Sequence, residues 1–368
     1  MIIGVPKEVK VHEYRVAMVP AGVQQLTAAG HEVLIQSGAG VGSSITDAAY
    51  ESVGARIIET ADELWKASEM VVKVKEPVAE EHERIQHGQT LFTYFHLAAV
   101  PELAPVLVEQ KAAAIAYETV ELADGRLPML HPMSVVAGKM ATQAGASLLE
   151  RGRGGKGILL GGVPGVRRGR VVVLGGGTSG TAAAKIAVGL GASVTIIDIS
   201  LPRLEYLDDV FGSRVNLVAS NPISIEEEVR RADLVVGAVL VPGRRAPTLV
   251  SRELVAAMDP GSVVVDIAVD QGGCIETIRP TTHDAPTYVV DDVLHYGVTN
   301  MPGAVAHTST YALTNATTRY ALRIAEMGPI EAAKADPALA KGFNTYDGRV
   351  THQAVAEDLG YEFSNLFN

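Results

Sequence analysis

Cysteine is almost absent from this sequence, since Cys274 is the only one among 368 residues. A single cysteine cannot form an internal disulfide bond or a Cys-rich zinc site, which fits a reducing compartment such as the cytoplasm. Long apolar runs are absent as well, because Asp266 interrupts even the valine run before it. Residues 1–4 place no basic segment before an apolar stretch. We therefore expect neither a signal peptide nor a membrane-spanning helix of about 18 residues.

Positive charge is scarce too. The sequence has 31 Lys and Arg residues against 42 Asp and Glu residues, which gives a formal net charge of −11. Binding to nucleic acid or to an anionic membrane calls for basic surface, so this balance argues against both partners. The hydrophobic fraction of 47% and the charged fraction of 20% are typical of a folded globular protein. We expect neither nucleic acid nor a membrane among its partners.

A length of 368 residues suggests two domains. Short β-branched runs alternate with amphipathic stretches, a pattern that predicts βαβ units and parallel sheets. The expected strands of the first part are 2–6, 32–36, 70–75, 90–96 and 113–118. Those of the second part are 170–175, 193–198, 215–220, 234–240, 262–269 and 287–291. We predict an α/β protein with two doubly wound parallel sheets, a Rossmann nucleotide-binding domain and a Rossmann-like substrate domain.

Two long helices are expected to join these domains. One spans 133–150 and the other 304–327, and both carry apolar residues at helical spacing. If the chain leaves the first domain by one helix and returns by the other, the first domain is discontinuous. We therefore assign residues 1–130 and 307–368 to the substrate domain and residues 131–306 to the dinucleotide-binding domain.

The stretch 175–180 contains Gly-x-Gly-x-x-Gly between an apolar run and a helical stretch. In that context the glycines permit a tight turn and let the backbone approach a pyrophosphate at the helix N-terminus. Asp198 follows the next strand, where an acid accepts from both ribose hydroxyls and repels a 2′-phosphate, so NAD is favoured over NADP. Arg203 is expected to flank the adenosine. The residues of the loop expected to bind the cofactor are Gly175, Gly177, Thr178, Ser179 and Gly180.

Ligands of such sheets bind at the carboxyl ends of the strands. This rule selects further candidates, although any strand end also needs turn residues. The candidates for the adenosine and ribose side are Ser220, Val239 and Leu240. The candidates for the nicotinamide side are Ile267, Asp270, Val298, Asn300 and Met301.

Three charged or titratable residues lie at the carboxyl ends of expected strands of the first domain. Arg15 follows the strand 2–6, Lys75 ends the strand 70–75, and His96 ends the strand 90–96. Facing the nicotinamide, they would form an anion pocket with an Arg fork for a carboxylate, a Lys point charge and a His proton carrier. Neighbouring positive charge should keep His96 neutral. The alternatives are solvated loop charges and a structural histidine. Asp270 would either cap a turn or move a proton opposite His96. The other histidines show no ligand spacing with acids, so we expect no metal.

Several segments resemble the alanine dehydrogenase and transhydrogenase family. They are GVPKE (4–8), EYRVA (13–17), LGGGTSG (174–180) with the aspartate at 198, RLEYL (203–207), VDIAVDQGGC (265–274) and HYGVTNMPG (295–303). The resemblance implies reversible conversion of L-alanine, NAD+ and water to pyruvate, ammonium and NADH by a homohexamer. It implies substrate binding by Arg15 and Lys75, acid–base roles for His96 and Asp270, and a cofactor contact at Ser134. Which of His96 and Asp270 activates the water stays open.

Three other functions remain as alternatives at this stage. The NAD-binding component of proton-translocating transhydrogenase is similar, but it lacks a histidine at the position of His96. Lysine- or saccharopine-type amino-acid oxidation also uses a Lys and His pair, with less likeness over 266–273. The third alternative is an NAD-sensing module with an inactive pocket. A metal site that some family members carry on the long C-terminal helix is not expected, because 323–327 reads RIAEM.

Overall fold

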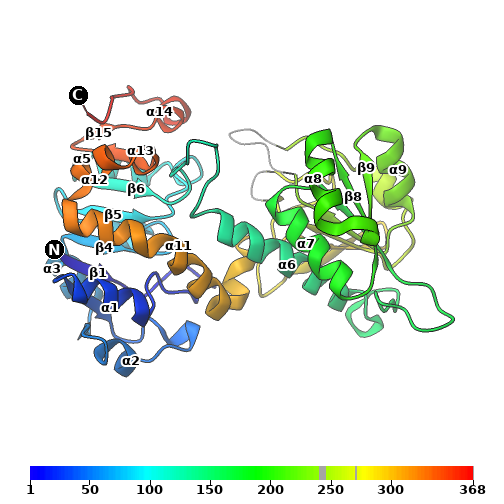
Figure 1. The fold of residues 1–368 in the computed structure, drawn as a ribbon, viewed down its shortest axis with the longest axis horizontal. Helices are drawn as coiled ribbons and strands as arrows, with labels where there is room; N and C mark the ends of the chain where they lie inside the picture. The colour runs from blue at the N-terminus through cyan, green and yellow to red at the C-terminus, as the bar shows by residue number, and fades with distance from the viewer. Residues whose placement is uncertain (240–245, 270–271, 368) are drawn as a thin grey trace. The chain divides into compact units, whose positions relative to one another are not determined.

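The computed structural model describes residues 1–239, 246–269 and 272–367, and the chain divides into two compact units (Figure 1). Unit 1 consists of Met1–Met133 and Gly303–Asn368, and unit 2 consists of Ser134–Pro302. Each unit is built on a mostly parallel sheet, so the predicted α/β class is confirmed. Two of the predicted site residues, Leu240 and Asp270, lie outside the described residues.

The sheet of unit 1 has the strand order β15-β14-β6-β5-β4-β1-β2-β3. Strands β1 to β6 pair in parallel, whereas the C-terminal strands β14 and β15 add an antiparallel edge next to β6. The sequence analysis missed β3, which has three residues and no fully buried side chain. The strands are β1 (Ile2–Val5), β2 (Glu32–Gln36), β3 (Arg56–Ile58), β4 (Met70–Val72), β5 (Thr90–Thr93), β6 (Ala113–Ala116), β14 (Phe343–Tyr346) and β15 (Arg349–Val350).

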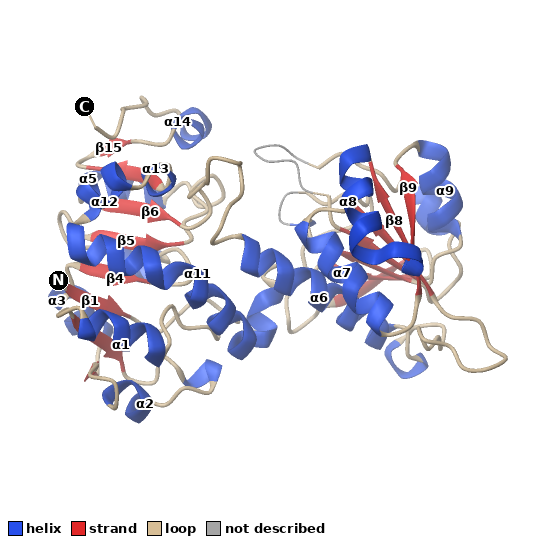
Figure 2. Cartoon of the chain, in the orientation of Figure 1, coloured by secondary structure: helices blue, strands red, loops and turns tan. Residues whose placement is uncertain are grey.

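Helices cover the sheet of unit 1. Leu64 and Trp65 of α3 and Leu103 and Leu107 of α5 join one apolar core with strand residues such as Leu91. Figure 2 shows α1 and α11 over the face turned to the viewer. The prediction of a helix over 304–327 is confirmed, with a 3₁₀ turn (Met301–Val305) before it. The helices are α1 (Pro20–Ala28), α2 (Asp47–Glu51), α3 (Ala61–Ala67), α4 (Ala79–His82), α5 (Leu103–Glu109), α11 (Ala306–Met327), α12 (Pro329–Ala335), α13 (Pro337–Ala340) and α14 (Gln353–Leu359).

The sheet of unit 2 has the order β12-β13-β11-β10-β7-β8-β9. The strands are β7 (Arg170–Leu174), β8 (Ser193–Asp198), β9 (Val215–Ala219), β10 (Leu234–Gly237), β11 (Val263–Asp266), β12 (Thr287–Val290) and β13 (Val293–Tyr296). The prediction that 287–291 is the sixth parallel strand is wrong. That segment forms β12, which runs antiparallel to β13 at the edge, and β13 is the sixth parallel strand. Asp291 and Asp292 make the turn with φ of 49° and 60°, a conformation that aspartate tolerates.

Both faces of the unit 2 sheet are buried. Val171 and Val173 of β7 point into one apolar core together with α6, α7 and α8, and Val172 and Leu174 point into another with α9 and α10. This alternation is the pattern of a doubly wound sheet. The helices are α6 (His131–Leu148), α7 (Thr178–Gly189), α8 (Leu201–Phe211), α9 (Pro222–Arg230) and α10 (Arg252–Ala256). Among the described residues, no helix combines the length and apolarity needed to cross a bilayer.

Candidate active site

The glycine-rich loop of unit 2 connects β7 to α7. Gly175 has φ of +94°, and a Cβ there would lie 2.8 Å from the Ala238 carbonyl oxygen. At Gly180 a Cβ would lie 1.8 Å from the Gly175 carbonyl oxygen, so only glycine lets α7 approach the loop this closely. Gly177 is the exposed N-cap of the 12-residue helix α7, and no side chain caps it. Half-buried Thr178 and Ser179 follow, which leaves the backbone N–H groups of this turn suited to a phosphate.

Asp198, at the end of β8, lies beside this loop. Its Oδ2 accepts a hydrogen bond from the Gly176 N–H at 2.6 Å, and its Oδ1 accepts from the Ser200 N–H at 2.8 Å. The carboxylate therefore caps a local turn, and an ionised carboxylate retains further acceptor sites for ribose hydroxyls. Asp198 and the glycine-rich loop beside it therefore fit the adenosine half of a dinucleotide.

The side chain of Arg203 binds the protein itself. Its Nε donates to the Gly176 carbonyl oxygen at 2.6 Å and its Nη2 to the Thr181 hydroxyl at 2.9 Å. The guanidinium also lies 4.7 Å from the centre of the Tyr206 ring. These contacts make Arg203 a brace between the glycine loop and α8, and its expected place beside the adenosine stays a prediction.

The other strand-end candidates of unit 2 divide into two groups. Val298 and Met301 are buried in the apolar core, so only their backbone atoms are available to a ligand. Ser220, Val239, Ile267 and Ser134 are half-buried, the first three just after β9, β10 and β11 and the last in the first turn of α6. Asn300 is also half-buried and has φ of 57°.

Asp266, which the sequence analysis used only as a break in an apolar run, organises the loop after β11. Its side chain is buried and accepts hydrogen bonds from the Ala268 N–H at 2.9 Å and the Cys274 N–H at 2.7 Å. Burial raises the pKa of this carboxyl group, although the N–H donors oppose the shift. The loop between these two anchors contains residue 270. Asp266 therefore holds both ends of the segment that carries the predicted catalytic aspartate.

In unit 1, Arg15, Lys75 and His96 follow β1, β4 and β5, which are neighbours in the sheet. The sequence predicted longer strands, to 75 and to 96, but β4 ends at Val72 and β5 at Thr93. The pKa of Lys75 is lowered, mainly by burial and then by the positive charge of Arg15. The two cations are thus close enough to interact, as an anion pocket requires.

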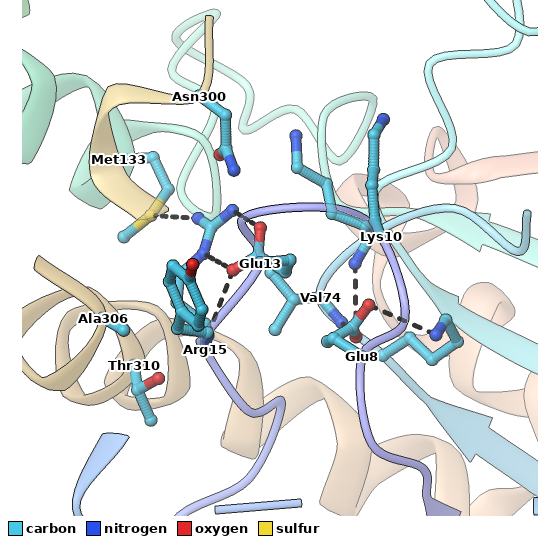
Figure 3. A network of polar contacts seen from close by, with 12 residues as sticks. Glu8, Lys10, Glu13, Arg15, Val74, Met133, Asn300, Ala306 and Thr310 are labelled. Atoms are coloured by element: carbon cyan, nitrogen blue, oxygen red, sulfur yellow. Dashed lines mark hydrogen bonds and ion pairs between the residues drawn. The ribbon is translucent and has the colours of Figure 1, made fainter. Parts of the chain in front are cut away.

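Arg15 is buried and paired with Glu13 (Figure 3). Its Nε donates to Glu13 Oε1 at 2.6 Å and its Nη2 to Oε2 at 2.5 Å, while Nη1 points to the Met133 sulfur at 3.1 Å. Burial acts to lower the pKa of Arg15, but the Glu13 carboxylate outweighs it and raises that pKa. The edge formed by Nε and Nη2 is therefore occupied by a protein carboxylate. Glu13 was missed because spacing alone does not tell a partner from a surface acid.

Glu8, Lys73 and Glu81 form a second buried network. The Lys73 amine lies 2.9 Å from Glu81 Oε1 and 3.2 Å from Glu8 Oε2, with all three side chains buried. Glu8 Oε1 also accepts from the Val74 N–H at 2.6 Å (Figure 3). Burial raises the pKa of Glu8, opposed first by Lys73. This network ties the loop after β1 to the segment that carries Lys75.

His96 is held at three points. Its Nδ1 lies 3.0 Å from Glu76 Oε2, and its ring stacks on Tyr94 with centroids 5.6 Å apart. Its backbone has φ of 48°, and its N–H donates to Glu118 Oε1 at 2.7 Å. The sequence predicted neighbouring positive charge for this imidazole, whereas the group that contacts its Nδ1 is the Glu76 carboxylate. Burial acts to raise the pKa of Glu76, but His96 and then Lys10 outweigh it and lower that pKa to about 2.

The chain is similar to known proteins over its full length. The family "Alanine dehydrogenase/PNT, N-terminal domain" matches residues 4–137, and "Alanine dehydrogenase/PNT, C-terminal domain" matches residues 141–353. An alanine dehydrogenase of Methanococcus maripaludis is 57% identical over 98% of this chain and 98% of its own length. A solved L-alanine dehydrogenase structure has a TM-score of 0.96 at 54% identity, covering 98% of this chain and 99% of that chain. For a transhydrogenase of Sinorhizobium meliloti the TM-score is 0.82 at 26% identity, covering 96% of this chain and 100% of that chain.

Proposed function

We propose, from the premise that this chain belongs to the alanine dehydrogenase/PNT family, that it is an NAD-dependent L-alanine dehydrogenase. The reaction converts L-alanine, NAD+ and water to pyruvate, ammonium, NADH and a proton. The observation that carries the proposal is the agreement in fold and sequence with a solved L-alanine dehydrogenase over 98% of the chain. The titratable strand-end residues of unit 1 supply the groups that this reaction needs.

NAD would be held by unit 2, between the glycine loop and the carboxyl ends of its strands. Gly175, Gly177 and Gly180 shape a backbone surface for the pyrophosphate, and Asp198 accepts from the ribose hydroxyls. When bound, NAD+ accepts the hydride from the substrate Cα. Because the Arg203 guanidinium is engaged by Gly176 and Thr181, this cation is not set aside for a 2′-phosphate. This supports NAD over NADP.

Unit 1 would hold the substrate. Arg15 and Lys75 bind the carboxylate and the carbonyl oxygen, because both are cations at the ends of neighbouring strands. Met133 at the Nη1 atom and Glu13 along the Nε–Nη2 edge fix the plane of the guanidinium. A fixed plane favours a planar carboxylate over a diffuse anion.

His96 and Asp270 would move the protons. Loss of hydride from the Cα of L-alanine with a neutral amino group leaves a protonated imine, and water adds to its carbon while His96 takes a proton from that water. The protonated imidazole then gives this proton to the nitrogen. The neutral imidazole takes the proton of the new hydroxyl group as the C–N bond breaks, so that ammonia leaves and pyruvate forms. Asp270 is the second proton carrier of the proposal.

A homohexamer in the cytoplasm completes the proposal: the family resemblance implies the homohexamer, and the single cysteine, Cys274, supports a reducing compartment. Sedimentation equilibrium of the purified chain tests the assembly. We expect a mass six times that of the 38.7 kDa chain. A monomer or a dimer over the whole concentration range would remove this part of the proposal.

The assay that tests the function measures NADH formation from L-alanine and NAD+ by the purified chain. We expect robust turnover with L-alanine and none with L-lysine. In the same preparation, hydride exchange between NADPH and an NAD analogue should be absent. Exchange without alanine oxidation would favour the transhydrogenase component, whose structural likeness is lower. NAD binding without either activity would favour a sensing module.

A further inference from the structure

The Glu76 carboxylate stands behind the proton carrier of the proposed reaction, on the side away from solvent. The Glu76 side chain is 3% exposed, whereas that of His96 is 37% exposed. The two residues follow the neighbouring parallel strands β4 and β5, and the contact joins Oε2 to Nδ1 at 3.0 Å. The second oxygen of Glu76 accepts a hydrogen bond from the Lys10 amine. The buried Glu76 carboxylate therefore contacts only the Nδ1 atom of the His96 ring.

The rest of the surroundings restrain the same ring. Tyr94 stacks on it with an interplanar angle of 21°, and the Tyr94 hydroxyl is fixed by donation to the Met129 carbonyl oxygen at 2.7 Å. Glu118 accepts from the N–H groups of Phe95 at 3.0 Å and of His96 at 2.7 Å. Within residues 1–239, 246–269 and 272–367, no hydrogen-bond partner engages Nε2. The imidazole is therefore held by its Nδ1 side, its face and its backbone.

We propose that Glu76 is the positioning residue of His96, accepting the Nδ1–H and thereby reserving Nε2 for the protons of the reaction. This inference rests on the proposed function for its catalytic meaning. An ionised carboxylate at Nδ1 fixes the tautomer with the lone pair on Nε2, and it stabilises the imidazolium that forms when Nε2 takes a proton. Glu76 does not itself exchange the proton. Its pKa of about 2 keeps it ionised throughout the working range.

Other charged side chains lie near the Glu76–His96 pair. Lys10 binds Glu76, Lys75 directly precedes Glu76 in the sequence, and Glu118 accepts a hydrogen bond from the His96 backbone. Tyr94 is neutral, because burial raises its pKa well above the ordinary value. Glu76 is the carboxylate that reaches the ring itself, so its removal should alter the pH profile in a way that loss of a distant charge does not.

The test compares Glu76→Gln with Glu76→Asp and with Glu80→Gln, an exposed acid of the same segment. We expect Glu76→Gln to lower kcat by about 100-fold with KM for L-alanine changed much less. The acidic limb of its kcat/KM profile should move to lower pH, since the charge that stabilises the imidazolium is gone. Glu76→Asp should restore part of kcat, and Glu80→Gln should match the wild type.

A second readout does not depend on activity. Nitrogen-15 spectra of the ligand-free protein, with the His96 signals identified by their loss in His96→Gln, report which ring nitrogen carries the proton. We expect Nδ1–H in the wild type and a mixture of tautomers in Glu76→Gln. Wild-type kcat, pH profile and tautomer in Glu76→Gln would overturn the inference while leaving the proposed function intact. A wild type that binds NAD but oxidises no alanine would remove the proposed function, and the spectra would still test the pairing.

Discussion

The strand ends of unit 1 carry charges that are buried and paired, whereas those of unit 2 are formed mainly by backbone groups. In unit 1 polar contacts join distant segments, as the ion pair of Glu8 with Lys73 and the contact of Glu76 with His96 do. In unit 2 the loop from Gly175 to Gly180 depends on close backbone approach, and its neighbouring acid, Asp198, binds backbone N–H groups.

This difference predicts how each region fails. Removal of one charge in unit 1 leaves its partner buried without a counter-charge. We therefore expect the free energy of unfolding of the whole unit to fall. Addition of one methyl group at Gly180 in unit 2 forces α7 away from the glycine-rich loop. We therefore expect weaker phosphate binding at that loop. The following variants would break or sharpen that comparison.

Lys73→Met should have the largest effect. Lys73 is buried between two carboxylates, and its loss leaves Glu8 and Glu81 without a counter-charge. We expect the free energy of unfolding to fall by about 3–5 kcal/mol in urea denaturation. The control is Lys341→Met, which removes a pair with half-exposed partners and should cost less than about 1 kcal/mol. Equal effects of the two variants would mean that the buried network does not hold unit 1 together.

The second prediction concerns acid stability. Because the pKa of Glu76 is about 2 in the folded protein, below its ordinary value of 4.5, folding favours the ionised form. This stabilisation, at most about 3 kcal/mol, is fully present above the ordinary value and is lost as the pH falls toward 2. The difference in unfolding free energy between the wild type and Glu76→Gln should therefore shrink as the pH falls from about 5 to about 2. A constant difference, like that expected for Glu80→Gln, would contradict the assignment.

Gly180→Ala is the corresponding variant of unit 2. The added Cβ would overlap the Gly175 carbonyl oxygen, and α7 would have to shift. We expect a loss of about 1–3 kcal/mol in stability together with a larger loss of NAD affinity, measured by calorimetry. Gly189→Ala at the other end of α7 meets no atom within 4 Å and should be neutral or slightly stabilising. NAD affinity that stays normal in Gly180→Ala would remove the glycine loop from the cofactor site.

Arg203→Met should have the smallest effect. It removes two hydrogen bonds that brace the glycine loop, so we expect NAD binding to weaken by about tenfold. NADP binding should not improve. Arg230→Met, which removes only an exposed ion pair with Glu226, serves as the control. If the ratio of NAD affinity to NADP affinity differed between the wild type and Arg203→Met, Arg203 would contact the ribose of the cofactor.

The two regions also differ in how far the sequence predicted them. The glycine spacing and the acid after β8 are local, so the β7–α7–β8 segment was predicted from neighbouring residues alone. The Glu8 bond to Val74 joins residues 66 positions apart, and only the pairing of β1 with β4 brings them together. The hairpin of β12 and β13 was missed because Asp291 and Asp292 adopt positive φ without a glycine.

His96→Ala, with NAD binding measured on the same preparation, tests the central claim most directly. The account predicts that kcat for L-alanine oxidation falls by at least about 100-fold, while the NAD dissociation constant stays close to that of the wild type. Turnover near the wild-type value in that variant would contradict it.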